Sequence, residues 1–167
     1  HDALRTTFVK VDGVPVQHVA ATLELPLALA DLSALPAGER ETQAQQLVAD
    51  AAQAPFDLMA GPLLRAGLVR LSGTEHLFLV TFHHIVFDGW SVGVFMNELA
   101  ALYGARVEGR ASPLPELAVQ YADFAHWQRQ WLDGEVLEGQ LAFWKDQLSG
   151  APALLALPTD RPRPPVQ

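Results

Sequence analysis

Two adjacent histidines followed by an acid form the stretch of this chain best suited to chemistry. The stretch reads Phe82-His83-His84-Ile85-Val86-Phe87-Asp88-Gly89-Trp90-Ser91. Imidazole has an ordinary pKa of about 6.5, so a histidine can take up or release a proton near neutral pH. Asp-Gly is a turn signal, and reactive residues often lie on loops that a rigid scaffold holds in place. The stretch therefore predicts a loop with acid–base chemistry.

An apolar run, Leu77–Phe82, leads into this loop and predicts a central strand that is buried on both faces. Side chains alternate between the two faces of a strand, so we expect His83 and His84 to point in opposite directions. Only one of them could then face a given substrate. The alternative interpretation is a pair of core histidines that are simply hydrogen-bonded.

No metal site is expected. Two diverging imidazoles cannot bind one ion together, and the sequence has no cysteine. The other histidines are scattered without the spacing of metal ligands; they are His1, His18, His76 and His126.

The segments before the histidine loop are mostly predicted strands. They cover residues 7–11, 14–19, 63–71 and 77–82, with a further short one over 23–29 that Pro26 confines to a sheet edge. Asp12-Gly13 is typical of a two-residue hairpin turn. One helix is predicted over 36–53. These patterns indicate a mixed α/β (α+β) fold in which a largely antiparallel sheet packs against helices.

Three helices are predicted after the loop. The first covers about 91–103, where apolar residues recur at helical spacing, and Gly104 is expected to end it. The others cover 121–132 and 135–148, with Asp133-Gly134 between them. We expect their tryptophans to pack in the core, because aromatic side chains at helical spacing dominate buried area.

Composition limits the class of protein. A chain of 167 residues is long enough for one compact domain. The net charge is −8, from 19 acidic and 11 basic residues, so no nucleic-acid partner is expected. No apolar run approaches the roughly 18 residues of a membrane helix, and the start lacks a signal-peptide pattern. We therefore expect no membrane contact and a cytoplasmic location.

The end of the sequence is rich in proline, with four prolines in residues 158–165. Such a stretch is typical of an extended linker. We expect residues 1–157 to form one subdomain and residues 158–167 to lead out of it toward a second.

The spacing His83-His84-x-x-x-Asp88-Gly89 resembles the HHxxxDG signature of nonribosomal peptide synthetase condensation domains. Chloramphenicol acetyltransferase and related CoA-dependent acyltransferases carry a shorter form, HxxxDG. Other segments agree in the family's order. Residues 2–8 look like the RHExLRTxF motif without its first Arg and with Asp for Glu; 121–128 look like YxDFAxWQ; 56–65 and 157–164 are similar to further recurrent stretches. The resemblance covers essentially the whole chain, but not the C-terminal half of such a domain.

The resemblance implies the N-terminal half of a chloramphenicol-acetyltransferase-like fold, whose active site lies in a tunnel between two halves. His84 maps to the central catalytic histidine, and His83 to a structural one that faces away from substrate. Asp88 maps to a structural carboxylate paired with an arginine. Arg5 is the candidate partner, and the motif's missing arginine is the alternative. Gly89 either offers its backbone N–H to an oxyanion or leaves room.

Four further residues are assigned structural support. Trp90 is expected to pack under the loop. Tyr121, Asp123 and Trp127 belong to the family motif and are expected to fix a helix against the core.

The activity implied by the resemblance is amide formation by aminolysis of a thioester. No cofactor is bound by the chain itself, since both substrates arrive on the phosphopantetheine arms of donor and acceptor carrier proteins. Further implied partners are the C-terminal subdomain of the same domain and an adenylation domain downstream.

Three alternatives remain open. An epimerisation domain and a CoA-dependent acyltransferase share the histidine signature. The chain could also be a catalytically inactive fragment or a subdomain that only docks a carrier. The Asp88-Gly89-Trp90-Ser91 context and the exit segment favour condensation, and we expect the chain without its second half to have little activity.

Overall fold

The computed structural model describes residues 1–153, 158 and 160–161. The chain divides into two compact units, His1–Phe124 and Ala125–Gln167, whereas composition predicts one compact domain. Length limits the size of a core, but it does not fix whether the chain builds that core in one piece. The proline-rich stretch and the boundary expected before residue 158 lie almost entirely outside the described residues.

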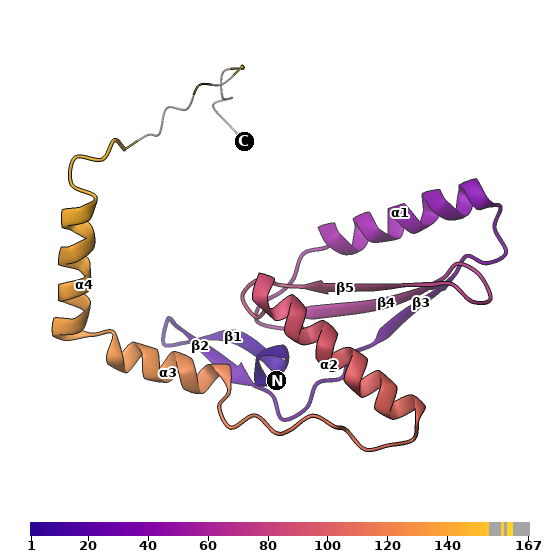
Figure 1. Ribbon diagram of the computed structural model, residues 1–167, viewed down its shortest axis with the longest axis horizontal. Coiled ribbons are helices and arrows are strands. Elements are labelled where there is room, and N and C mark those ends of the chain that lie inside the picture. Colours follow the sequence, from indigo (N-terminus) through magenta and orange to yellow (C-terminus); the bar gives the residue numbers. More distant parts are fainter. Residues whose placement is uncertain (154–157, 159, 162–167) are drawn as a thin grey trace. The chain divides into compact units, whose positions relative to one another are not determined.

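Three strands form the sheet that supports the histidine loop (Figure 1). β3 (Leu27–Asp31), β4 (Leu64–Arg70) and β5 (His76–Phe82) lie in the order β3-β4-β5. β3 runs parallel to β4, and β5 runs antiparallel to β4. β3 begins directly after Pro26, because proline lacks the N–H that strand pairing needs. It lies at the sheet edge, as its sequence predicts.

β5 is an edge strand, and its prediction as a central strand buried on both faces is wrong. Phe78 in its middle is 42% exposed. The central strand is β4, where Val69 is buried and Leu63, just before the strand, has no exposed surface. An apolar run indicates that a strand is hydrophobic, but not how many strands lie beside it. The arginines of β4 make this strand look less buried in the sequence than β5, although it is the central one.

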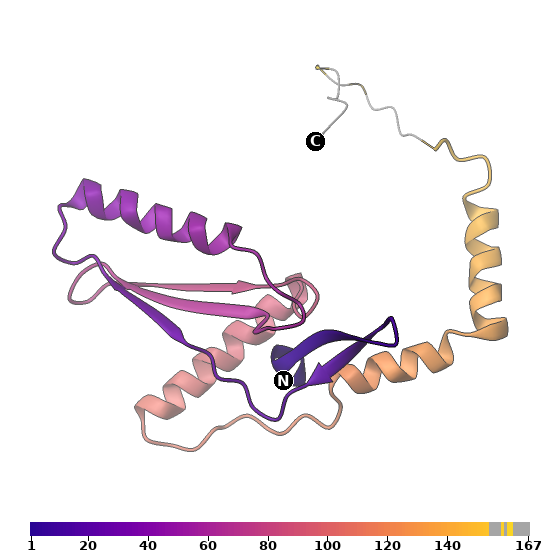
Figure 2. The same cartoon turned by 180° about the vertical axis from the view of Figure 1, so that it is seen from behind.

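Helix α1 (Ala37–Gln53) covers one face of this sheet, and its bounds agree with the predicted helix. Ala44 of α1 is buried together with Leu32 and Val69, and Leu77 and Leu79 pack against them. Figures 1 and 2, which view the molecule from opposite sides, both show α1 running alongside the strands.

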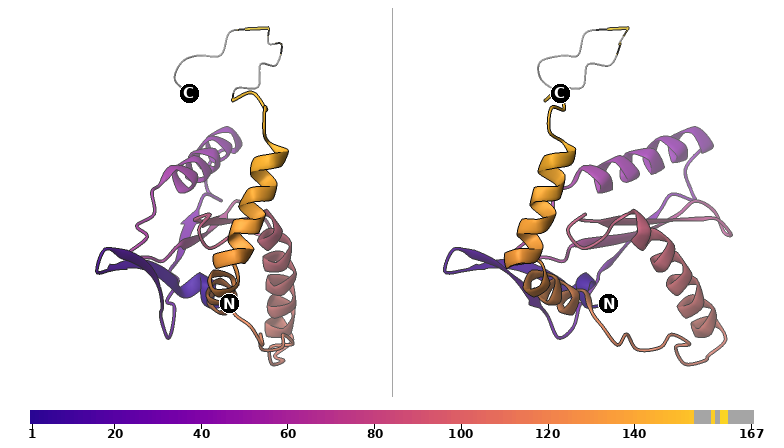
Figure 3. Two further views of the ribbon diagram at one scale, coloured as in Figure 1. Left: turned by 90° about the vertical axis from the view of Figure 1, so that its left-hand side faces the viewer. Right: turned by 60° about the vertical axis from the view of Figure 1, so that its left-hand side comes forward.

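Helix α2 (Gly89–Val107) lies on the other face of the sheet. Because side chains alternate along β5, Phe82 points away from the face that holds Leu79. The Phe82 ring stacks on Phe87 with 3.8 Å between centroids and meets Phe95 of α2 edge-on at 5.1 Å. Both views of Figure 3 show α1 and α2 on opposite sides of the three strands.

The predicted end of α2 at Gly104 is wrong. The helix continues to Val107, and Gly109, with φ of 68°, is the left-handed residue that follows its end. A glycine inside a helix costs only about 1 kcal/mol relative to alanine, so it does not by itself stop a helix. Ala105, the next residue, is buried, and this burial stabilises the helix beyond Gly104.

A separate hairpin precedes the sheet and is confirmed as predicted. The short 3₁₀ helix η1 (Asp2–Arg5) leads into β1 (Thr6–Val11), which pairs antiparallel with β2 (Val14–Val19). Asp12 and Gly13 have φ of 51° and 80°, the left-handed pair that a tight hairpin turn requires. The sheets together are mixed and mostly antiparallel.

Helices α3 (Tyr121–Trp131) and α4 (Gly134–Gln147) agree with the predicted helices within one or two residues. Their tryptophans do not pack in a core, contrary to expectation: Trp127, Trp131 and Trp144 are each about half exposed. Trp127 stacks on Trp131 along α3 with 5.6 Å between centroids. Helical spacing shows that side chains share a face, but it does not show that something covers that face. No helix in the described part of the chain is long and apolar enough to cross a membrane.

Two glycine-to-alanine changes test this description in opposite directions. Gly61→Ala should destabilise the chain by about 1–3 kcal/mol. Gly61 has φ of 61°, and an added Cβ would lie 2.8 Å from Cγ2 of Thr7. Gly104→Ala should stabilise it by up to about 1 kcal/mol, since an added Cβ meets no atom within 4 Å. Thermal and urea unfolding measure both, and a destabilising Gly104→Ala would mean that α2 ends there after all.

Candidate active site

A tight turn at the end of β5 carries the two histidines. The backbone N–H of His83 donates to the carbonyl of Leu63 at 2.9 Å and so continues the pairing of β5 with the chain before β4. The chain then turns: the N–H of Val86 donates to the His83 carbonyl at 3.1 Å, and the N–H of Ile85 donates to Nδ1 of His83 at 3.0 Å. His84 is the second residue of this turn and is exposed.

His84 lines a cavity of about 800 Å³. The walls come from η1, the hairpin, the histidine turn, α2 and the segment before α3. They include the polar or ionisable side chains of His1, Thr6, Gln17, His84, Asp88, Ser91, Glu98, Ser112, Glu116 and Tyr121. The apolar part of the lining includes Phe8, Phe87, Phe95 and Leu99. The cavity therefore combines an apolar body with a few polar groups, as small-molecule sites commonly do.

His83 has different surroundings from His84, although the strand whose alternation was expected to separate them ends at Phe82. It does not line the cavity, and its ring lies edge-on to Phe56 with 5.9 Å between centroids. Its Nδ1 accepts a hydrogen bond from the Ile85 N–H, so that nitrogen carries no proton in this geometry. The structure thus places one imidazole at the cavity wall and uses the other to close the turn.

Asp88 caps the first turn of α2. Its Oδ1 accepts from the Ser91 N–H at 2.9 Å and from the Ser91 hydroxyl at 2.7 Å, and Ser91 Oγ accepts in return from the Asp88 N–H. These are the reciprocal bonds of a capping box. The hydrogen bonds from the Ser91 hydroxyl and backbone hold the pKa of Asp88 below its ordinary value, with a smaller contribution from His84. Asp88 is therefore a carboxylate at neutral pH.

Arg5 does not pair with Asp88, contrary to expectation. Its Nη2 lies 2.6 Å from Oδ1 of Asp2, and its Nη1 donates to the carbonyl of Ala20. Asp88 is exposed rather than buried, so its charge is solvated and needs no guanidinium partner. Arg5 instead ties η1 to the residue that follows β2.

Gly89, the first residue of α2, has open space around it: an added Cβ would meet no atom within 4 Å. Its backbone N–H belongs to the first turn of a helix, where N–H groups lack intrahelical partners.

Of the four support residues, Trp90 is placed differently from its prediction. Trp90 is 87% exposed at the start of α2 and lines the cavity, so it does not pack under the loop. Tyr121 is 59% exposed and also lines the cavity. Asp123 accepts a hydrogen bond from the Gln120 N–H at 2.9 Å and so fixes the start of α3. Trp127 is half exposed, and its ring stacks on Trp131 of the same helix. Because α3 is amphipathic, its sequence indicates an apolar face but not what that face meets.

Sequence reasoning missed one ionisable pair in the cavity wall. Nε2 of His1 lies 2.7 Å from Oε2 of Glu98. The position of Glu98 three residues after Phe95 indicates which face of α2 carries this carboxylate, but no local pattern gives His1 as its partner.

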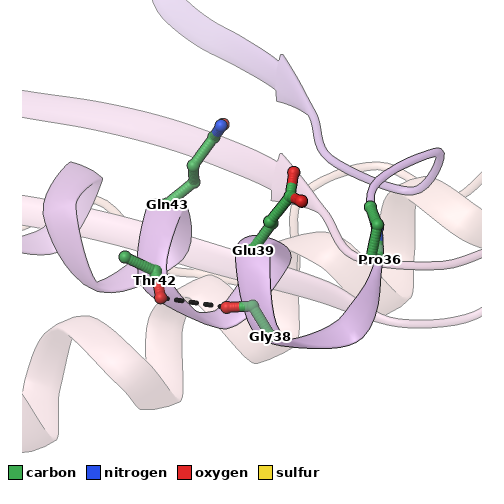
Figure 4. A pocket seen from close by; sticks show the side chains of 5 residues that line it. All are labelled: Pro36, Gly38, Glu39, Thr42 and Gln43. Carbon is green, nitrogen blue, oxygen red and sulfur yellow. Dashed lines mark hydrogen bonds between the residues drawn. The ribbon is translucent and has the colours of Figure 1, made fainter.

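A second depression lies at the start of α1 and has a volume of about 570 Å³ (Figure 4). Pro36, Gly38, Glu39, Thr42 and Gln43 line it, and the Thr42 hydroxyl donates to the Gly38 carbonyl at 2.9 Å. No imidazole lines it, so the cavity at His84 is the better candidate. Within the described residues, no three His, Asp or Glu side chains gather as a metal site would require.

The sequence matches the family described as Condensation domain over residues 1–167. The chain belongs to the condensation-domain family. It is 56% identical over 167 residues to one of the linear gramicidin synthase proteins of Brevibacillus parabrevis. That match covers 100% of this condensation-domain chain and 3% of the synthase protein.

Solved structures of the same fold cover nearly the whole chain. A chain of the complex of the X-domain and OxyB from teicoplanin biosynthesis has a TM-score of 0.79 and 36% identity, over 98% of this chain and 35% of that one. The epimerization domain from the third module of a tyrocidine synthetase has a TM-score of 0.79 and 26% identity, over 96% and 36%. These likenesses confirm the chloramphenicol-acetyltransferase-like α/β fold. The condensation-domain chain spans about a third of the solved chains that it matches.

A double-mutant cycle tests the corrected partner of Arg5. The losses of stability in Arg5→Ala and Asp88→Ala should add, because the two side chains share no contact. Arg5→Ala and Asp2→Ala should instead show a coupling of about 0.2–1 kcal/mol, as expected of a partly exposed ion pair. Urea unfolding of the single and double variants measures both couplings. A clear coupling between Arg5 and Asp88 would restore the pairing expected from the family motif.

The lowered pKa of Asp88 gives a pH test. A carboxylate with a depressed folded-state pKa contributes its stabilisation fully above its unfolded pKa and loses it as the pH falls through the folded value. Asp88→Asn keeps a helix-capping oxygen but does not titrate. The Tm difference between the natural chain and Asp88→Asn should therefore be constant above the ordinary value of 3.8 and shrink below it. A difference that is unchanged down the acid range would show that the Ser91 bonds do not favour the charged form.

Proposed function

We propose that the chain is the N-terminal subdomain of a condensation domain that forms amide bonds in nonribosomal peptide synthesis. The substrates are a donor aminoacyl or peptidyl thioester and an acceptor aminoacyl amine, each on a carrier protein. The observation that carries this proposal is the placement of the two motif histidines. His84 lines the cavity of about 800 Å³, whereas His83 closes the turn behind it.

The proposed reaction joins the acceptor amine to the donor carbonyl. The amine nitrogen attacks the thioester carbon, a tetrahedral oxyanion forms, and the C–S bond breaks to release the donor's pantetheine thiolate. The proton lost by the amine ends on that thiolate. His84 either relays this proton or accepts a hydrogen bond from the amine and so aligns its lone pair.

Magnitudes favour alignment as the larger contribution. General-base help gives about 10²–10⁴-fold, which corresponds to roughly 3–5 kcal/mol. Holding two reactants in line can lower a barrier by about 7–11 kcal/mol. We therefore assign His84 first to positioning the amine and second to proton transfer.

Asp88 is assigned a structural role in this mechanism. A general base needs a pKa near the working pH, and the Ser91 bonds move the pKa of Asp88 in the opposite direction. Its capping bonds with Ser91 instead fix where α2 starts relative to the histidine turn. For the oxyanion, the proposed donor is the backbone N–H of Gly89, which belongs to the first turn of α2.

The carriers supply the phosphopantetheine, so the chain needs no cofactor of its own. The proposed partners are the two carrier domains, the C-terminal subdomain of the same domain and a downstream adenylation domain, in the cytoplasm. The chain spans about a third of the solved chains that it matches. Since the cavity here has walls from one subdomain alone, we expect the chain by itself to have little activity.

Epimerisation is the second candidate, because an epimerization domain matches this fold with the same TM-score as the X-domain complex. Epimerisation would remove and return a proton at the α-carbon of one carrier-bound residue and would form no amide. Incubation of the complete domain with loaded carriers separates the two reactions. Condensation gives a dipeptidyl carrier when an acceptor is present. Epimerisation in deuterated water instead exchanges the α-hydrogen of a single aminoacyl carrier for deuterium.

Replacement of each histidine by alanine in the complete domain tests the assignment of His84. His84→Ala should lower the rate of dipeptidyl-carrier formation by at least about 10²-fold with an unchanged melting temperature. His83→Ala should lower both the rate and the melting temperature, because it removes the acceptor for the Ile85 N–H. If His83→Ala keeps its fold and is the more damaging of the two, the wrong imidazole has been assigned to the reaction.

A further inference from the structure

Phe56 and Arg65 lie next to the histidine turn but do not line the cavity. They bound the recurrent stretch of residues 56–65, to which the proposed mechanism gives no role. Phe56 follows the end of α1, and Arg65 is the second residue of β4. The two side chains therefore connect the helix that covers the sheet with the strand that pairs with β5.

Arg65 is held by the carbonyl end of α1. Its Nη1 donates to the Pro55 carbonyl at 3.0 Å, and its Nη2 donates to the carbonyls of Ala54 at 2.6 Å and Ala51 at 3.4 Å. The last carbonyls of a helix lack intrahelical partners and carry partial negative charge. The guanidinium reaches the carbonyl of Ala51 in the last turn, that of the C-cap residue Ala54 and that of Pro55 just after it, which leaves Arg65 little freedom to move.

Arg65, Phe56 and His83 contact one another in series, and we call this series of contacts the stack. The guanidinium carbon of Arg65 lies 3.7 Å from the centroid of the Phe56 ring, a close cation–π contact. The other contact of Phe56 is the edge-on one with His83, at 5.9 Å and an interplanar angle of 87°. In edge-on pairs the positive rim of one ring meets the negative face of another, so the ring orientation is specified as well as the distance.

The orientation of His83 sets the shape of the turn. Its Nδ1 accepts the Ile85 N–H, so a neutral His83 carries its proton on Nε2. Rotation of the ring, or a proton on Nδ1, would remove this acceptor and leave the Ile85 N–H without the bond. His84 lies between His83 and Ile85, so a change in that bond moves the imidazole that faces the cavity.

We propose that Phe56 and Arg65 are positioning residues for His84. They fix the His83 ring in the orientation and Nε2–H tautomer that close the turn, and the turn in turn fixes His84. This inference rests on the proposed function, in which His84 aligns the acceptor amine. A displacement of about 1 Å at a reacting group can cost about 10²-fold in rate, so a small loosening of the stack should be visible in turnover.

Two substitutions on each position separate positioning from general stability. Phe56→Leu removes the aromatic ring, and Phe56→Tyr retains it. Arg65→Gln removes the cation, and Arg65→Lys retains the charge without the fork. Arg40→Ala is the matched control: Arg40 also donates from the α1 side to a backbone carbonyl, that of Leu71 at 3.2 Å, but it does not touch the stack.

The first readout uses this chain itself and needs no substrate. Long-range ¹⁵N–¹H spectra of histidine-labelled protein report which ring nitrogen of His83 carries the proton. We expect the Nε2–H form in the natural chain, in Phe56→Tyr and in Arg40→Ala. Phe56→Leu and Arg65→Gln should show a mixture of tautomers and at least about tenfold faster amide exchange at Ile85. An unchanged His83 spectrum in Phe56→Leu and Arg65→Gln, whatever their melting temperatures, would overturn the proposal.

The second readout is dipeptidyl-carrier formation by the complete domain. Phe56→Leu and Arg65→Gln should lower kcat by about 10–100-fold with little change in KM, and Phe56→Tyr should restore most of it. Equal losses in Phe56→Leu and Phe56→Tyr would contradict an aromatic positioning role. If the natural domain forms no amide at all, the proposed function fails, whereas the His83 spectra still decide whether the stack fixes the turn.

Discussion

The hydrogen bond from the His83 N–H to the Leu63 carbonyl is the constraint on which the geometry of the cavity wall depends. Leu63 has no exposed surface, so water cannot replace this bond, and its loss would leave two backbone groups unpaired. The bond is the last one that holds this part of the chain to the sheet. His84 comes directly after it and is the first residue to leave the sheet. An imidazole thus reaches the cavity because a buried strand pair ends one residue earlier.

The second anchor of the histidine loop is chemically different from the first. Asp88 holds the start of α2 through its exchange of hydrogen bonds with Ser91, at the surface and with its charge solvated. The loop is therefore fixed by backbone pairing at one end and by a side-chain cap at the other. The rings of Phe82 and Phe87 stack on each other, and Phe95 of α2 meets both edge-on, so that these contacts join β5 to α2. A short loop between two fixed ends has few conformations to lose when a substrate binds.

Local chemistry was predicted well from the sequence. The Asp12-Gly13 hairpin requires a left-handed backbone pair that few other residues adopt. The two histidines differ in surroundings because β5 ends at Phe82 and the chain turns at His83, not because a strand alternates through both residues. Relations between elements were predicted less well. β5 reads as a central strand because apolar residues favour strands whether or not a neighbour lies on each side. The exposed tryptophans of α3 were expected in a core because their spacing indicates an apolar helix face. That spacing does not show which other element, if any, covers the face.

The acid of the motif illustrates both sides of this limit. That Asp88 is charged could be inferred from its residue type, but its partner could not. Arg5 forms its ion pair with Asp2, three residues before it, and not with Asp88. The His1–Glu98 contact joins residues 97 positions apart, and no local pattern announces such a pair. Contacts of this kind depend on how η1 and α2 meet, which follows from packing rather than from spacing.

The capping role of Asp88 also explains the length of the motif in terms of helical phase. Each residue advances an α-helix by about 100°, so the residue at which α2 begins decides which of its side chains face the cavity. Three residues separate His84 from Asp88, and this number brings Ser91, Phe95 and Glu98 onto the cavity side. One residue more or fewer would start the helix a third of a turn out of phase and turn a different stripe of α2 toward the histidine. The number of residues between His84 and Asp88 thus determines how α2 is rotated about its own axis.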